Sequence, residues 1–213
     1  MFTDSNPAAA AALPLVCRLL SCVPPLARPA WIHPAILGLE NTSMGLPEVD
    51  RMKNSDRGLP SNFSWLEPCR MAGTSVPRSV AELAAMVREG VAHLVSLSPD
   101  TPPPPFPLKG LTIHYINVKE FEGPSMDQME EFLHICEVAK AAGEGVAVHC
   151  RGGNGRTGTM LAVYLVWSRG MEARAAVEEV RRTRPGSVES DRQIKAIEDF
   201  RHRLGATRSN QES

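Results

Sequence analysis

Residues 145–167 read GVAVHCRGGNGRTGTMLAVYLVW. The first five, Gly145 to His149, form a brief apolar run that is typical of a strand buried on both faces. The last eleven, Thr157 to Trp167, carry apolar side chains at helical spacing and predict an apolar helix. A glycine-rich turn joins the two, and with its flanks it reads His149-Cys150-Arg151-Gly152-Gly153-Asn154-Gly155-Arg156-Thr157-Gly158.

This turn has the features of a phosphate-binding cradle. Its glycines let the backbone turn tightly and bring N–H groups close to an anion. The helix that starts near Arg156 points its positive dipole end at the same place, and Arg156 can add bidentate hydrogen bonds to two phosphate oxygens. No Gly-Lys-Ser/Thr follows the glycines, which excludes a Walker-type nucleotide loop. The predicted phosphate-binding residues are Cys150, Arg151, Gly152, Gly153, Asn154, Gly155 and Arg156.

Cys150 stands at the mouth of this cradle, where N–H groups, a helix N-terminus and an arginine all favour a thiolate. A thiolate there can attack phosphorus in line and form a phosphocysteine, which water then hydrolyses. Thr157 can donate its hydroxyl to the sulfur and ease the departure of the thiolate. We interpret His149 as an organiser of Cys150, because a thiol that is already ionised needs no base. A buried cysteine is more often a small hydrophobe, and we interpret Cys136 in that way.

Strands alternate with helices on either side of this stretch. Capping boxes at Ser79 and Ser125 predict two helix starts, and Gly90 and Gly143 suit the ends of these helices. We expect strands at 62–66, 70–72, 91–97, 111–118 and 145–149, and helices at 80–88 or 89, 126–142, 157–167, 173–182 and 190–204. This order predicts an α/β fold with a largely parallel sheet and helices on both of its sides.

The first sixty residues differ from the rest of the chain. Five prolines between positions 14 and 34 break any long helix, and residues 41–61 show no sustained periodicity. We interpret residues 1–60 as a poorly ordered extension, a dispensable tail, with targeting or partner docking as the alternative. The catalytic domain is expected at 61–205, followed by a flexible tail at 206–213.

The composition limits the classes of partner. Hydrophobic residues make up 43% of the 213 residues, charged residues 22%, and the formal net charge is −1. This balance gives no reason to expect binding to nucleic acid or to a membrane surface, and no apolar stretch is long enough to span a bilayer. The five cysteines include no Cys-x-x-Cys pair, so we expect neither a zinc site nor a redox dithiol. Reduced thiols are typical of the cytoplasm, and the nucleus is a second expected location.

The cradle resembles the HCxxGxxRTG signature of the protein tyrosine phosphatase superfamily. From about Asn62 to about Phe200, the chain also resembles the small atypical dual-specificity phosphatases of that superfamily. The matching motifs are Asn62-Phe63-Ser64-Trp65, Arg70-Met71-Ala72-Gly73, His93-Leu94-Val95-Ser96-Leu97, Arg156-Thr157-Gly158-Thr159-Met160-Leu161-Ala162 and Arg184-Pro185-Gly186-Ser187. The resemblance implies a four- to five-stranded, mostly parallel sheet flanked by helices, the absence of a metal or other cofactor, and activity on phosphotyrosine and phosphoserine/threonine.

The leaving oxygen needs a proton, which this superfamily usually takes from an aspartic acid on a loop before the long helix. That aspartate aligns with Glu120, so the sequence departs from the family pattern. Glutamate is chemically competent, but its extra methylene moves the carboxyl, and a misplacement of about 1 Å can cost on the order of a hundredfold in rate. We predict that Glu120 is the acid, with Glu122 and Asp127 as competitors. Asp127 is better interpreted as a favourable charge in the first turn of a helix.

Two features near the C-terminus leave alternatives open. By analogy with the family, Gln193 would position the hydrolytic water, and an exposed helical glutamine is an equal alternative. The basic cluster Arg181, Arg182 and Arg184 could add a positive field near the site. We interpret this cluster as a solvated face that compensates the helix C-terminus.

The sequence thus predicts a monomeric protein phosphatase that acts on phosphorylated proteins. A domain of about 150 residues leaves little room for loops that deepen the pocket, which favours dual specificity. One alternative is a phosphatase for RNA 5′-ends or phosphoinositides, although only Arg151 is basic between Cys150 and Arg156. Another is a phosphate-binding adaptor with a misplaced acid, against which the intact Cys150, Arg156 and Thr157 argue.

Overall fold

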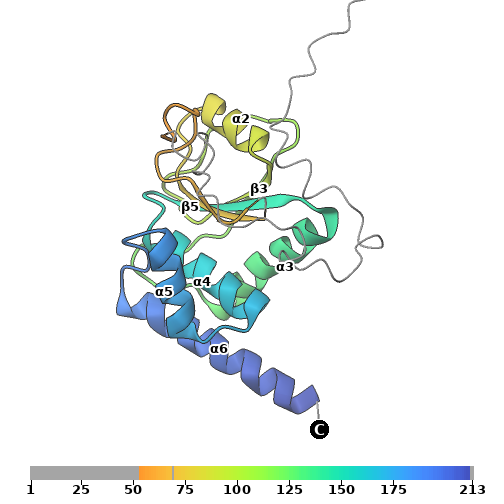
Figure 1. Cartoon of the computed structure of the whole chain (residues 1–213), viewed down its shortest axis with the longest axis vertical. Helices are drawn as coiled ribbons and strands as arrows, with labels where there is room; N and C mark the ends of the chain where they lie inside the picture. The colour runs from red at the N-terminus through yellow and green to blue at the C-terminus, as the bar shows by residue number, and fades with distance from the viewer. Residues whose placement is uncertain (1–52, 69, 212–213) are drawn as a thin grey trace, which may run out of the picture. The chain divides into compact units, whose positions relative to one another are not determined.

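Figure 1 shows the chain as a computed structural model, which describes residues 53–68 and 70–211. Most of the extension predicted at 1–60 therefore lies outside the described residues. Its last part is described. Residues 54–58 form turns, and Leu59 is buried in a hydrophobic cluster, so the packed part of the chain begins before residue 60.

Five strands form one sheet in the order β1-β2-β5-β3-β4. β1 pairs with β2 in the antiparallel direction, and all other neighbours in this sheet are parallel. The strands are β1 Ser64–Glu67, β2 Met71–Ser75, β3 Val91–Ser96, β4 Thr112–Tyr115 and β5 Gly145–Cys150. β5 is the central strand, and His149 near its end pairs with Thr74 of β2 and Ser96 of β3.

Helices cover both faces of this sheet. They are α2 Val80–Arg88, α3 Met126–Ala142, α4 Gly155–Arg169, α5 Ala173–Thr183 and α6 Asp191–Gln211. Figure 1 shows α2 on one face and the other four helices on the opposite face, where α5 and α6 pack against α4. The predicted α/β fold, with a mostly parallel sheet of four to five strands flanked by helices, is confirmed, and the sheet has five strands. Within the described ranges, no helix combines the length and the apolar character needed to cross a membrane.

The central strand β5 is buried along its whole length. Val146, Val148 and Cys150 pack in the larger hydrophobic cluster, which includes α3 and α4. Ala147 belongs to the smaller cluster under α2, because successive side chains of a strand point to opposite faces. Cys150 therefore leaves the sheet on the face that α4 covers.

The two predicted capping boxes both start helices. At α3 the box is complete, because the Ser125 hydroxyl accepts from the Gln128 N–H and the Gln128 side chain accepts from the Ser125 N–H at 2.8 Å. At α2 the Ser79 hydroxyl accepts from the Glu82 N–H at 3.1 Å. The Glu82 carboxylate, however, accepts from the N–H of Arg78 instead of that of Ser79.

Several elements differ in length from the prediction, among them β4 and α6. The regular part of β4 ends at Tyr115, although Ile116 and Val118 still donate to carbonyls at the end of β3. Helix α6 continues past the predicted end at residue 204 to Gln211. Gly205 does not stop it, because a glycine costs a helix only about 1 kcal/mol relative to alanine. The tail predicted at 206–213 is therefore helical as far as residue 211.

Candidate active site

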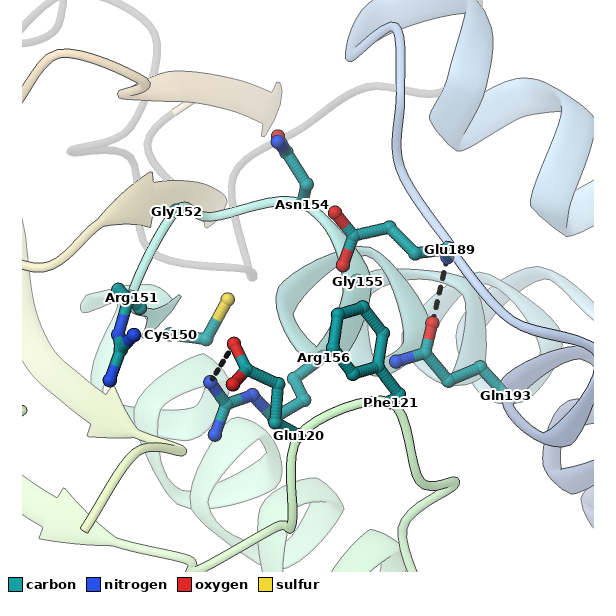
Figure 2. Close-up of a pocket in the computed structure, with 10 residues that line it drawn as sticks. All are labelled: Glu120, Phe121, Cys150, Arg151, Gly152, Asn154, Gly155, Arg156, Glu189 and Gln193. Atoms are coloured by element: carbon teal, nitrogen blue, oxygen red, sulfur yellow. Dashed lines mark hydrogen bonds and ion pairs between the residues drawn. The ribbon is translucent and has the colours of Figure 1, made fainter. Parts of the chain in front are cut away.

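The turn after β5 lies at the carboxyl edge of the parallel strands, where α/β proteins bind ligands. A cavity of about 220 Å³ opens there. Figure 2 shows its lining residues, which are Glu120, Phe121, Cys150, Arg151, Gly152, Asn154, Gly155, Arg156, Glu189 and Gln193. The turn, the loop after β4 and the start of α6 thus meet at one site.

The sulfur of Cys150 receives two hydrogen bonds. The backbone N–H of Gly153 and the hydroxyl of Thr157 each lie 3.2 Å from this sulfur, and both are donors. Donors aimed at a buried sulfur stabilise its thiolate form. The predicted proximity of Thr157 to the sulfur is therefore present.

Arg156 is buried and its guanidinium is fixed at two points. One nitrogen donates to the Val118 carbonyl at 3.1 Å, and the other lies 3.6 Å from a carboxylate oxygen of Glu120. Figure 2 shows the Glu120 carboxylate turned into the cavity, toward the Cys150 sulfur. The arginine and the predicted acid therefore reach the same cavity as the predicted nucleophile.

The glycines of the turn meet different constraints. Gly153 has a φ of +78°, and a Cβ built on it would lie 2.5 Å from the Thr74 carbonyl oxygen. A Cβ on Gly155 would collide with Glu189. A Cβ on Gly152 would meet no atom closer than 3.9 Å. The close approach of the turn to β2 therefore requires glycine at 153, whereas 152 is sterically open.

The side chains of Arg151 and Asn154 bind residues outside the turn. Arg151 is 58% exposed and pairs with Asp100 at 2.7 Å, and this pair helps to lower the pKa of Asp100, after a larger contribution from a backbone hydrogen bond. The Asn154 side chain accepts a hydrogen bond from the Asn62 amide at 2.8 Å. Each of these two predicted phosphate-binding residues thus has a side-chain partner elsewhere, Asp100 for Arg151 and Asn62 for Asn154.

His149 is buried next to the predicted nucleophile. Its Nδ1 lies 3.3 Å from the Cys150 carbonyl oxygen, and its Nε2 has no hydrogen-bond partner in the part of the chain that the structure describes. Burial, together with the positive charge of Arg156, lowers the pKa of His149 to about 4. The ring is therefore neutral near pH 7, as suits an organiser of the backbone at Cys150.

The three predicted candidates for the acid lie in different places. Glu120 lines the cavity, Glu122 forms an ion pair with Arg192, and Asp127 lies in the first turn of α3. A second carboxylate, that of Glu189, lines the cavity from the loop before α6. Glu189 was not predicted from the sequence, because nothing in the pattern of that loop marks it as part of the site.

Gln193 is fully buried at the cavity, so the alternative of an exposed helical glutamine is wrong. Its side-chain oxygen accepts from the Glu189 N–H at 2.8 Å. Its side-chain nitrogen finds no acceptor among the described residues. A buried donor without a partner is uncommon in folded proteins, and this one belongs to a residue that lines the cavity.

The solvated-face interpretation is wrong for Arg184, which is only 3% exposed. Its guanidinium donates to the Ser64 hydroxyl and to three carbonyls, those of Asn62, Gly73 and Gly153. Burial lowers the pKa of Arg184 to about 10, against an opposing effect of Cys150, so the side chain is a cation near pH 7. In the same cluster, Arg182 is exposed and pairs with Glu179, and Arg181 binds carbonyls of the next loop.

A cysteine in a backbone nest beside a buried arginine is the arrangement of a cysteine-dependent phosphatase. A family model described as PTP-SAK, the Swiss Army Knife protein DSP-PTPase phosphatase domain, matches residues 60–197. The chain belongs to this family. It therefore carries a phosphatase domain of the protein tyrosine and dual-specificity class at these residues.

Mouse dual specificity protein phosphatase CDC14B is 29% identical over 167 residues, which are 68% of this chain and 32% of that protein. The match thus spans about a third of this relative's length. Among solved structures, Tk-PTP in its active form is 31% identical with a TM-score of 0.60, over 67% of this chain and 97% of Tk-PTP. PTPMT1 in complex with PI(5)P has a TM-score of 0.60 at 15% identity, over 68% of this chain and 98% of PTPMT1, and shows the fold alone.

Proposed function

We propose that the chain is a protein phosphatase that hydrolyses phosphotyrosine and phosphoserine or phosphothreonine esters, with Cys150 as the nucleophile. The environment of the Cys150 sulfur is the observation that carries this proposal. Two donors reach the sulfur at 3.2 Å, and the buried Arg156 lines the same cavity. Such groups stabilise negative charge on the sulfur before attack and on the phosphoryl oxygens during it.

In the first step the Cys150 thiolate attacks phosphorus opposite the ester oxygen. The S–P bond forms while the P–O bond breaks, and protonated Glu120 gives its proton to the leaving oxygen. Arg156 holds two of the phosphoryl oxygens, as a planar guanidinium can. The products of this step are the free hydroxyl compound, a phosphocysteine and an ionised Glu120.

In the second step water attacks the phosphocysteine. The Glu120 carboxylate takes a proton from that water as the S–P bond breaks, which releases inorganic phosphate and restores the thiolate. Thr157 donates its hydroxyl to the departing sulfur, to which it is already bonded at 3.2 Å. We assign to Gln193, which lines the cavity, the role of holding the attacking water.

The pairing of charged residues around the cavity supports a protein substrate over a polyphosphorylated lipid. Arg151 is the basic residue that a lipid headgroup would need beside Arg156, and it pairs with Asp100. Glu189 adds a carboxylate to the lining, and it repels a further phosphate next to the reacting one. We further propose that the enzyme acts as a monomer on phosphorylated proteins in the cytoplasm and nucleus, where Cys136 and Cys150 stay reduced.

A substrate panel tests this proposal. The full-length protein is assayed with an aryl phosphate, phosphotyrosine and phosphothreonine peptides, a phosphoinositide and a 5′-phosphorylated RNA. We expect turnover of the aryl phosphate and of both peptides, loss of all turnover with Cys150→Ser, and no effect of a chelator. A higher kcat/KM for the phosphoinositide or the RNA than for the peptides would contradict the proposed substrate class. If no ester is hydrolysed, the chain is a phosphate-binding adaptor and not a phosphatase.

The acid is tested by comparing Glu120→Gln with Glu122→Gln and Glu189→Gln. The Glu120 variant should lose roughly 10²–10⁴-fold in kcat on phosphothreonine peptides, which have a poor leaving group. It should lose much less on an aryl phosphate, whose leaving group barely needs a proton. If the alkaline limb of the pH–rate profile disappears only in the Glu122 or the Glu189 variant, the assignment of Glu120 is wrong.

A further inference from the structure

Two motifs of the sequence, those that begin at Asn62 and at Arg184, have no part in the mechanism above. The structure brings their side chains to the back of the phosphate cradle, on the side away from the cavity. Arg184 donates to the Asn62 carbonyl at 2.9 Å, so the two residues also contact each other. They are far apart in the sequence, and one precedes β1 while the other follows α5.

Asn62 holds one peptide unit of the cradle. Its side-chain amide donates to the Gly152 carbonyl at 3.0 Å. The N–H of the same peptide unit, that of Gly153, donates to the Cys150 sulfur at 3.2 Å. Because the C=O and N–H of a trans peptide point in opposite directions, the bond at the back fixes the direction of the donor at the front.

Arg184 holds the next peptide unit in the same way. Its guanidinium donates to the Gly153 carbonyl at 2.7 Å. The N–H of that unit belongs to Asn154, and it must point away from Arg184, toward the cavity that Asn154 lines. The guanidinium is anchored to β2 by its bond to the Gly73 carbonyl at 2.9 Å. A Cβ on Gly73 would approach the guanidinium to 2.9 Å, so glycine at 73 leaves room for it.

Arg184 also brings a second buried positive charge to the site. No carboxylate within the described ranges forms an ion pair with it, and Cys150 raises the pKa of Arg184 against the larger, opposite effect of burial. A buried cation without a carboxylate partner is costly, so its four hydrogen bonds and the nearby sulfur must offset that cost. Its charge favours an anion on the other side of the peptide units that it holds.

We propose that Asn62 and Arg184 form a clamp behind the cradle. They are positioning residues that aim two consecutive N–H groups at the sulfur and at the bound phosphoryl group. They touch neither the substrate nor the reacting atoms. This inference rests on the proposed function, because it assigns the clamp to the same cradle and the same nucleophile.

The test measures the pH dependence of alkylation of Cys150 by iodoacetamide, read on its own peptide by mass spectrometry. Arg184→Met and Asn62→Ala should each raise the midpoint of alkylation, by about one pH unit for Arg184→Met. Inhibition by inorganic phosphate should weaken about tenfold, and kcat should fall more than KM rises. Arg184→Lys should restore part of the shift, because it keeps the charge but not the forked geometry.

Arg181→Met is the matched control, because Arg181 also donates to backbone carbonyls, those of Ser187 and Val188, but to none in the cradle. It should lower thermal stability without moving the midpoint. If Arg184→Met does not fold, the same two measurements on Asn62→Ala test the clamp, because Asn62 is only half-buried. The clamp is refuted if the midpoint and the phosphate inhibition stay at wild-type values, or if Arg181→Met shifts the midpoint equally. If the proposed function itself is wrong, the result is different: the wild-type protein does not hydrolyse any of the phosphate esters.

Discussion

The proposed role of Thr157 in the second chemical step can be isolated by mutation. This residue is buried at the start of α4 and donates to the Cys150 sulfur. A hydrogen bond to a charged group contributes about 1.5–3 kcal/mol, which corresponds to roughly ten- to a hundredfold in rate. We therefore expect Thr157→Val to lower kcat by that factor and to let the phosphoenzyme accumulate.

Rapid mixing with an aryl phosphate measures this effect. The variant should release a burst of aryl alcohol followed by a slow steady state, and Thr157→Ser should recover most of the steady rate. A variant with a slow rate but no burst would mean that Thr157 serves the first step instead of the second.

Because the pKa of His149 is lowered in the folded chain, we predict that the free energy of unfolding depends on pH. Burial, with Arg156, lowers its pKa in the folded chain to about 4, from an ordinary value of 6.5. Below pH 6.5 the unfolded chain therefore takes up a proton that the folded chain does not, so the free energy of unfolding falls as the pH falls toward 4. The loss from this residue is about 2 kcal/mol at pH 5 and on the order of 3 kcal/mol by pH 4.

Urea unfolding of the wild type and of His149→Gln at pH 7 and pH 5 checks this expectation. His114, whose pKa is also lowered, first by burial and then by His93, is present in both proteins. The difference between the two proteins in the free energy of unfolding that is lost from pH 7 to pH 5 therefore reports His149 alone. Equal losses of stability in both proteins between pH 7 and pH 5 would show that His149 does not titrate as described.

The residues of the site could be predicted from the sequence where they lie close to one another along the chain. Cys150, Arg156 and Thr157 lie within one turn and its helix, so their proximity follows from local geometry. Arg184 could not be predicted in this way. A run of arginines at the end of a helix usually faces solvent, and only the packing of its loop against β1, β2 and the cradle buries this one. Glu189 reaches the cavity through the same long-range packing.

At the scale of an element, the turn between β5 and α4 gives the sharpest prediction. Gly153 has a positive φ and lies against the β2 backbone, whereas Gly152 is sterically open. An L-residue in the left-handed region costs roughly 1–2 kcal/mol before any clash is counted. Gly153→Ala should therefore lower the unfolding temperature and reduce kcat/KM at least about tenfold.

The matched variant is Gly152→Ala, whose added methyl meets no close atom. Its unfolding temperature should stay at the wild-type value, and its loss of kcat/KM should be the smaller of the two. If Gly152→Ala proves the more damaging to stability, the steric account of this turn is wrong.

Elements with local signals could be predicted closely. Helix α3 runs from Met126 to Ala142 as expected, because a capping box starts it and Gly143 in the left-handed conformation ends it. The ends of strand β4 and helix α6, expected at residues 118 and 204, were wrong by several residues. The end of a strand depends on where its neighbour stops pairing, and this is a property of the sheet.

At the scale of the whole molecule, alternation of strands and helices predicts the α/β class but not the order of the strands. β5, the last strand in the sequence, lies at the centre of the sheet. This position buries both faces of β5 between two hydrophobic clusters. It also places the cradle between the ends of β2 and β3, where α4, α6 and the loop after β4 can all contribute side chains.

The whole account depends on a covalent bond between phosphorus and the sulfur of Cys150. Acid quenching of the full-length protein during turnover of an aryl phosphate, followed by peptide mass spectrometry, tests this directly. We predict one phosphoryl group on the peptide that contains Cys150, more of it in Thr157→Val, and none in Cys150→Ser. A phosphoryl group on another residue, or steady turnover by Cys150→Ser, would contradict the account.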